Sequence, residues 1–166
     1  MRLGAALGNG RVASAKRICR VGISVTFAIG LILGLIEMGF GSSIAQLASE
    51  DPNVGEKMDK LKPLVALVIS LQLVWWPIYE VLLKQGRTAA AGIITAACGV
   101  VFMLPFSYVF TSVFPMGIVG VWMGLLGGYC IAIAIEMNMI ASSDWEKLAE
   151  DARRRSEVVA EEEKCL

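Results

Sequence analysis

The sequence predicts an all-α fold, that of a polytopic membrane protein with four transmembrane helices. Hydrophobic residues make up 56% of the 166 residues, charged residues make up 18%, and the mean hydropathy is +0.65. Soluble domains contain roughly 45–50% apolar and about 25% charged residues. The apolar residues gather in four long blocks, and the charges lie between and beyond these blocks. Four spans with so few charges favour membrane helices over the buried helices of a soluble protein.

Residues 1–20 form a basic segment before the first block. They contain five basic side chains and no acidic one: Arg2, Arg11, Lys16, Arg17 and Arg20. The apolar stretch after them is too long for the apolar core of a signal peptide, and no small-residue cleavage site follows it. We therefore expect the first block to be a membrane helix.

Transmembrane spans are expected over residues 21–47, 63–83, 89–114 and 117–141. Each reaches the length of about 20 residues that crosses a hydrocarbon core about 30 Å thick. Residues 21–141 together therefore make up the expected transmembrane region.

The connections between the spans carry residues that end helices. A polar loop opens at Glu50, and a helix stop is expected before Pro52. Gly86 follows the second span in a tight turn, and Pro115 lies in a short uncharged turn. Residues 142–166 are predicted to form a charged surface helix that ends in an acidic stretch.

The basic residues also predict the orientation in the membrane. All of them except Lys57, Lys60 and Lys62 lie in the N-terminal segment, the turn after the second span and the tail. With four spans, these three segments share one side, and Lys and Arg are enriched on the cytoplasmic side. Both termini are therefore predicted to be cytoplasmic.

Small residues at a spacing of four predict two helix-packing faces. The first span carries Thr26, Gly30, Gly34, Glu37 and Gly41 on one stripe, and the fourth carries Gly120, Gly124, Gly128 and Ala132. Small residues let membrane helices approach closely, so these stripes are expected to face other helices.

Glu37 shares the stripe of the first span and is expected to face protein. An ionisable group inside a span costs roughly 2.5–3.5 kcal/mol on insertion scales, so we expect it to have either a partner or a functional role. Glu37 either carries a proton or receives a cation, or it is a hydrogen-bonded structural residue.

The second span carries Gln72, Trp76 and Glu80 at a spacing of four, with Tyr79 beside Trp76. An aromatic and acidic face suits an organic cation through cation–π and charge contacts. In the alternative interpretation the tryptophan packs against protein, and Glu80 pairs with Lys84 one turn later.

Two prolines inside spans, Pro77 and Pro105, are expected to kink their helices. Glu136 lies near the cytoplasmic end of the fourth span and is expected to snorkel or to pair.

Several classes of function are disfavoured by the composition. The chain has no histidine, and its four cysteines are scattered, so no metal site is expected. No nucleophile–base pair is visible, so we expect neither an enzyme nor a cofactor. The formal net charge of zero does not suggest a nucleic-acid partner.

Four stretches, in order, resemble the multidrug and toxic compound extrusion (MATE) family. Residues 2–17 read RLGAALGNGRVASAKR, similar to the family's R-V-G-N-x-L-G-A-G-N…A-K-R segment. Residues 86–105 follow its G-R-x…G-x-I-I-N…L-P pattern, with Thr95 in place of the asparagine. Residues 117–125 resemble its G-x-x-G-L-W-I-G-L stretch, and residues 144–153 resemble its tail after the last helix.

The resemblance implies the last four of twelve helices, and hence a C-terminal fragment whose partners are the other helices or another copy. Such transporters expel organic cations in exchange for protons or sodium by alternating access. The tail suggests a eukaryotic branch, and both the plasma membrane and an acidic organelle are compatible with the sequence. Gln72 stands where many members have an aspartate in the cavity, and compensation by Glu37 or Glu80 is a hypothesis.

Two further interpretations stay open. The chain is either a truncated four-helix membrane protein without transport of its own, or a small drug/proton antiporter that dimerises. Glu37 superficially supports the second, but the motifs are those of the larger family.

Overall fold

The computed structural model describes residues 2–48 and 52–164, and it contains only helices and turns within these ranges. The helices are α1 (Arg2–Gly8), α2 (Val12–Ala48), α3 (Pro52–Lys84), α4 (Thr88–Ala97), α5 (Leu104–Tyr108), α6 (Ile118–Ala141) and α7 (Trp145–Lys164), with π-helical segments η1 (Cys98–Met103) and η2 (Val109–Val113) on either side of α5. Four of the helical stretches are long and apolar enough to cross a membrane: Val12–Ile44, Lys57–Lys84, Thr88–Val113 and Ile118–Ala141. The predicted all-α, four-span fold class is therefore confirmed.

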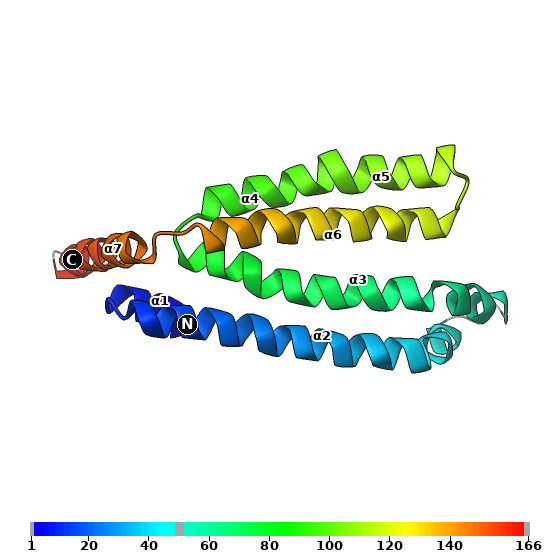
Figure 1. Cartoon of the computed structure of the whole chain (residues 1–166), viewed down its shortest axis with the longest axis horizontal. Coiled ribbons are helices and arrows are strands. Elements are labelled where there is room, and N and C mark those ends of the chain that lie inside the picture. Colours follow the sequence, from blue (N-terminus) through cyan, green and yellow to red (C-terminus); the bar gives the residue numbers. More distant parts are fainter. Residues whose placement is uncertain (1, 49–51, 165–166) are drawn as a thin grey trace.

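The spans form an open row in the order α2, α3, α6 and the α4–α5 segment (Figure 1). Each helix packs on its neighbours in this row, and within the described residues α2 does not pack directly on α6. The N- and C-terminal helices α1 and α7 lie at one end of the row, beside the turn between α3 and α4. We call this end of the molecule the terminal end.

The helices extend further than the sequence analysis predicts. The first long helix begins at Val12 rather than at residue 21, so the basic segment is itself helical, apart from a break between α1 and α2. The second begins at Pro52 rather than at residue 63, because proline is accepted in the first turn of a helix. Of the expected polar loop, Glu50 and Asp51 lie outside the described residues.

Glycines allow α2 and α3 to approach closely. A Cβ added at Gly30 would lie 3.0 Å from the backbone oxygen of Ser70, and one at Gly34 would lie 3.1 Å from that of Ala66. The Ser70 hydroxyl lies between the two helices and is within hydrogen-bond distance of the carbonyls of Gly30, at 2.9 Å, and Ala66, at 2.8 Å. The small-residue stripe of α2 therefore lies against α3.

The second glycine stripe faces the α4–α5 segment. A Cβ on Gly120 would lie 2.7 Å from the carbonyl carbon of Phe110, and one on Gly124 would lie 2.5 Å from the backbone nitrogen of Ser107. The facing helix departs from α geometry on both sides of α5, which contains Pro105. Proline has no N–H to donate, and π-helical turns are common where the hydrogen-bond ladder is interrupted.

The turn between α3 and α4 ends one span and starts the next. Gly86 has a φ of +80°, a conformation that glycine adopts without a steric penalty. Its N–H donates to the Leu83 carbonyl, and the Arg87 N–H donates to the Leu82 carbonyl, both at 3.0 Å. These two bonds form a Schellman motif, which closes the C-terminus of α3.

The best-buried apolar cluster lies at the terminal end. It joins residues of α1, α2, α3, α6 and α7, among them Leu7, Leu82, Ile140 and Trp145. Along the spans, by contrast, many apolar side chains are exposed, and only 11% of the apolar window of α2 is buried. This exposure is expected for helices whose outer faces contact lipid or other membrane helices.

Candidate functional site

The predicted aromatic and acidic face of the second span lies on the open side of α3. Gln72, Trp76 and Glu80 are exposed and share one stripe, and Tyr79 is half-buried. The Trp76 and Tyr79 rings meet edge to face, with centroids 6.3 Å apart. Trp75 packs behind them, with its ring centroid 5.4 Å from that of Tyr79. The four predicted residues are therefore together on one helix, and Pro77 lies among them in α3.

Glu80 pairs with Lys84 one turn later. Its Oε2 lies 3.3 Å from Lys84 Nζ, and both side chains are close to half exposed. This is the arrangement that the alternative interpretation of Glu80 describes. An exposed pair of this kind contributes about 0.3–0.5 kcal/mol, so it does not prevent Glu80 from meeting another cation.

Glu37 lies apart from this face, on the neighbouring helix α2. Its carboxylate lies over Gly41, where a Cβ would also meet the alkyl chain of Lys62 at 3.3 Å. The Lys62 ammonium group pairs with Asp59 at 2.5 Å. Glu37 is half-buried among residues of α2 and α3, and the structure does not bring it together with Trp76 or Glu80.

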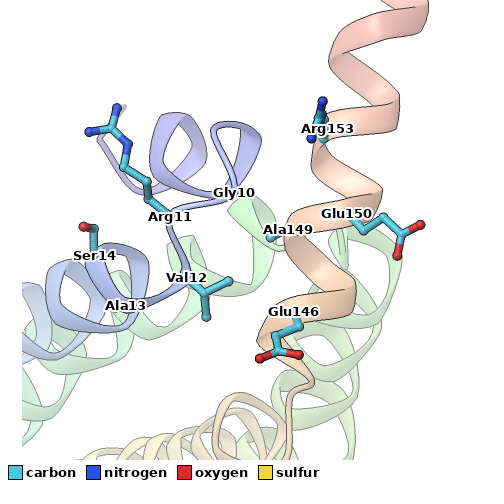
Figure 2. Close-up of a pocket in the computed structure, with 9 residues that line it drawn as sticks. All are labelled: Gly10, Arg11, Val12, Ala13, Ser14, Glu146, Ala149, Glu150 and Arg153. Atoms are coloured by element: carbon cyan, nitrogen blue, oxygen red, sulfur yellow. The ribbon is translucent and has the colours of Figure 1, made fainter.

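A wide surface pocket of about 660 Å³ opens between α7 and the junction of α1 and α2 (Figure 2). Its charged side chains do not converge. Arg11 points away from α7, and Glu150 points away from the junction. Glu150 pairs with Arg154 at 3.0 Å, and Arg153 pairs with Glu157 at 3.2 Å. Charges of both signs are present, and Glu150 and Arg153 are engaged in pairs on α7 itself, so this pocket favours no particular ligand.

A buried polar cluster lies between α3, α4 and α6. Its centre is Glu136 of α6, whose side chain is fully buried. Neither carboxylate oxygen has a hydrogen-bond partner among the described residues, and the same holds for the indole N–H of Trp75 and the hydroxyl of Thr95. Trp75 lies near enough to interact with the carboxylate, although the pair does not reach hydrogen-bond geometry. Buried polar groups are nearly always paired, so this cluster calls for an explanation.

Three further side chains surround Glu136 and Trp75 in this cluster. Cys98, at the start of η1, is buried and interacts electrostatically with Glu136. Thr95 lies three residues before Cys98 and therefore on the same face of its helix. Tyr129 lies two turns before Glu136 on α6, and its ring centroid is 5.9 Å from that of Trp75.

The expectation that Glu136 snorkels or pairs is wrong. Glu136 continues the glycine stripe of α6, because Gly120, Gly124, Gly128, Ala132 and Glu136 follow one another at a spacing of four and are all buried. Extending that stripe by one more step in the sequence would have identified the carboxylate. Position near the end of a span was the misleading signal, since the side chain points along the packed face and not toward water.

Comparison with known proteins places the chain among transport proteins of one family. The MatE family model matches residues 1–109. The chain is 27% identical to Protein DETOXIFICATION 36 of Arabidopsis thaliana, over 93% of this chain and 31% of that protein. It is 26% identical to Multidrug and toxin extrusion protein 2 of Homo sapiens, over 94% of this chain and 26% of that protein. The chain thus spans about a third or less of the length of these relatives.

A solved structure shares the fold. The crystal structure of the eukaryotic MATE transporter AtDTX14 superposes on 92% of this chain with a TM-score of 0.82 and 22% sequence identity, and the match covers 36% of that transporter. The row of four spans is therefore a recurring arrangement and belongs to a larger helical assembly in that protein.

Proposed function

Since this chain belongs to the MatE family of membrane transporters, we propose that it supplies four transmembrane helices to a secondary antiporter of organic cations. The observation that carries this proposal is the family-model match over residues 1–109, which includes two complete spans and part of a third. Transport of this kind exchanges the organic cation for protons or sodium by alternating access. Membership in a transporter family also means that the protein is not an enzyme.

The organic cation is proposed to meet the face formed by Gln72, Trp76, Tyr79 and Glu80. Aromatic faces attract cations, with energies that rise from roughly 0.5–1 kcal/mol at exposed sites to about 2 kcal/mol when desolvated. Trp76 is 51% exposed, and so it is accessible to a ligand in this chain. A carboxylate one turn away adds a counter-charge without fixing the shape of the ligand, which suits a transporter of varied cations.

The partners of the chain are proposed to be further membrane helices, either of a longer transporter or of a second copy. Two observations support this. The chain spans about a third or less of its relatives, and many large apolar side chains of α2, such as Leu35 and Phe40, are exposed. A four-helix protein without transport of its own is the second candidate.

Transport is tested in liposomes that contain the purified chain and an imposed proton or sodium gradient. Ethidium serves as the organic cation, and its gradient-driven accumulation is followed by fluorescence. We expect Trp76→Ala to raise the half-saturating ethidium concentration several-fold, whereas Phe40→Ala, which truncates an exposed side chain of α2, leaves it unchanged. Absence of gradient-driven ethidium movement with this chain would favour the second candidate.

Both termini are proposed to face the cytoplasm. In the structure, α1 and α7 share the terminal end with the α3–α4 turn (Figure 1), and these segments carry most of the basic residues. Single cysteines introduced at Ser14 and Glu150 are expected to react with a membrane-impermeant maleimide only after the membrane is opened. Labelling of either one in intact cells would contradict this orientation.

A further inference from the structure

We propose that Glu136, with Trp75 and Thr95 as its neighbours, forms a proton-binding site inside the membrane region. The site lies between α3, α4 and α6, and its Trp75 ring also contacts Trp76 and Tyr79 of the exposed face that is proposed to meet the organic cation. The inference deepens the proposed function, since it identifies the ion that the transporter exchanges as a proton. The protonation of Glu136 itself can nevertheless be tested without transport.

The geometry around Glu136 favours a neutral carboxyl group in the state that the structure describes. The side chain is fully buried, and both oxygens lack a partner among the described residues. An isolated carboxylate in an apolar interior is far more costly than a neutral acid, and buried charges are normally paired. A proton on the carboxyl group removes the charge and most of this cost.

Within the described residues, no ion pair neutralises the Glu136 carboxylate instead. Arg87, in the turn between α3 and α4, donates from Nη1 to the Met139 carbonyl of α6 at 3.2 Å, three residues beyond Glu136, and is therefore engaged elsewhere. Among the titratable groups of the neighbouring helices, Cys98 of η1 faces the carboxylate, and Tyr129 lies two turns away on α6. Neither group carries a positive charge, so neither can form an ion pair with Glu136.

The same cluster contains the donors that a deprotonated Glu136 would need. The Trp75 indole N–H and the Thr95 hydroxyl are both buried and have no acceptor among the described residues. Trp75 is near enough to interact with the carboxylate, so a rotation of its ring can give a deprotonated Glu136 a hydrogen bond, and the Thr95 hydroxyl is a further donor on the facing helix. Hydrogen bonds to a charged acceptor are about twice as strong as neutral ones, so both protonation states have a supporting arrangement.

A proton fits this cluster better than a metal cation. Sodium and other hard cations take several oxygen ligands, and the side-chain oxygens left without a partner in this part of the described structure are those of Glu136 and the hydroxyl of Thr95. The Trp75 indole N–H is a donor without an acceptor lone pair, so it can bind a carboxylate but cannot be a ligand of a metal cation. Glu136 is also joined to the packing surface, because its stripe on α6 contacts the α4–α5 segment, and a change in its charge therefore acts directly on helix packing.

Infrared difference spectroscopy of the purified chain tests the proposal. A protonated carboxyl group has a carbonyl band that carboxylates lack, and we expect such a band at neutral pH in the wild type. The band should be missing in Glu136→Gln, whose amide has the shape of the neutral acid, and it should remain in Glu150→Gln, which removes an exposed, ion-paired carboxylate. The band should also disappear reversibly as the pH is raised.

The outcomes separate the alternatives. A neutral-pH spectrum without the band, or a band that survives in Glu136→Gln, would overturn the proposal. A band that persists to the alkaline limit of folding would show a permanently neutral structural residue, which also overturns it. Trp75→Phe, which removes the N–H and keeps an aromatic ring, should keep the band to a higher pH than the wild type, because the carboxylate loses a donor.

A transport assay tests whether Glu136 couples proton movement to movement of the organic cation. In liposomes in which the wild type accumulates ethidium, Glu136→Gln should abolish proton-driven accumulation but leave ethidium binding to the protein unchanged. Full proton-driven accumulation in this variant would overturn a role in coupling. If the wild-type chain moves no ethidium, the four-helix protein without transport of its own is favoured, while the infrared measurement still decides the protonation of Glu136.

Discussion

Replacement of Gly124 by alanine should loosen the packing of α6 against the α4–α5 segment. A Cβ at this position would lie 2.5 Å from the backbone nitrogen and 2.7 Å from the Cα of Ser107. Carbon atoms pack best at about 3.5–4.0 Å, so the two backbones must separate by roughly 1 Å. Neither neighbour is the flexible end of a side chain, and the strain is therefore not relieved locally.

The size of the effect follows from three contributions. Overpacking costs typically 1–3 kcal/mol. The separation also endangers the hydrogen bond from the Ser107 hydroxyl to the Val121 carbonyl, at 3.2 Å, which is worth about 0.5–1.5 kcal/mol. Alanine is a better helix former than glycine, and this difference stabilises the variant by about 1 kcal/mol. The net loss of stability is thus expected to be about 0.5–3.5 kcal/mol.

The matched control is Gly39→Ala in α2, where an added Cβ would meet no atom within 4 Å. This control isolates helix propensity and should leave stability unchanged or raise it by up to about 1 kcal/mol. Thermal unfolding of each variant in detergent, followed by circular dichroism, provides the measurement. A loss of 1 kcal/mol lowers the Tm of a chain of this size by roughly 2–4 °C. A Gly124→Ala variant as stable as Gly39→Ala would refute the close approach of α6 to α5.

Three further predictions use the same assays. Ser70→Ala removes the hydroxyl that lies 2.9 Å from the Gly30 carbonyl and should cost about 0.5–1.5 kcal/mol; an unchanged Tm would mean that this contact between α2 and α3 contributes nothing. Trp145→Ala removes a largely buried side chain by which α7 packs on the rest of the terminal end. Limited trypsin treatment should therefore cut α7 faster in this variant than in the wild type. Equal rates of cleavage would show that other contacts hold this helix. Glu80→Gln breaks only the exposed pair with Lys84, so it should change the free energy of unfolding by less than about 1 kcal/mol and lower the affinity for ethidium. A large loss of stability would assign Glu80 a structural role.

The site could be predicted from the sequence only in part. The residues of the α3 face share one helix, and a spacing of four is enough to bring Gln72, Trp76 and Glu80 together. The pair between Glu80 and Lys84 is local for the same reason. The spacing of four on α6 also assigns Glu136 to the packed glycine stripe, but its lack of a partner depends on α3 and α4, which are distant in the sequence. Thr95 and Trp75 likewise become its neighbours only when three helices pack together.

The sequence by itself determined the number of spans and the polar or apolar character of each segment. Hydropathy and length are local properties of the chain, and a bilayer selects helices by these properties alone. It also determined the turn at Gly86, because a positive φ is a local requirement that glycine meets. The tertiary structure decided the order of the spans in the row, the contact of each glycine stripe with its partner helix, and the enclosure of Glu136. In a membrane the apolar side chains are equally stable against lipid and against protein, so hydropathy cannot specify which faces meet. That choice depends on close backbone approach and on a few buried polar groups, which exist only once the helices are packed.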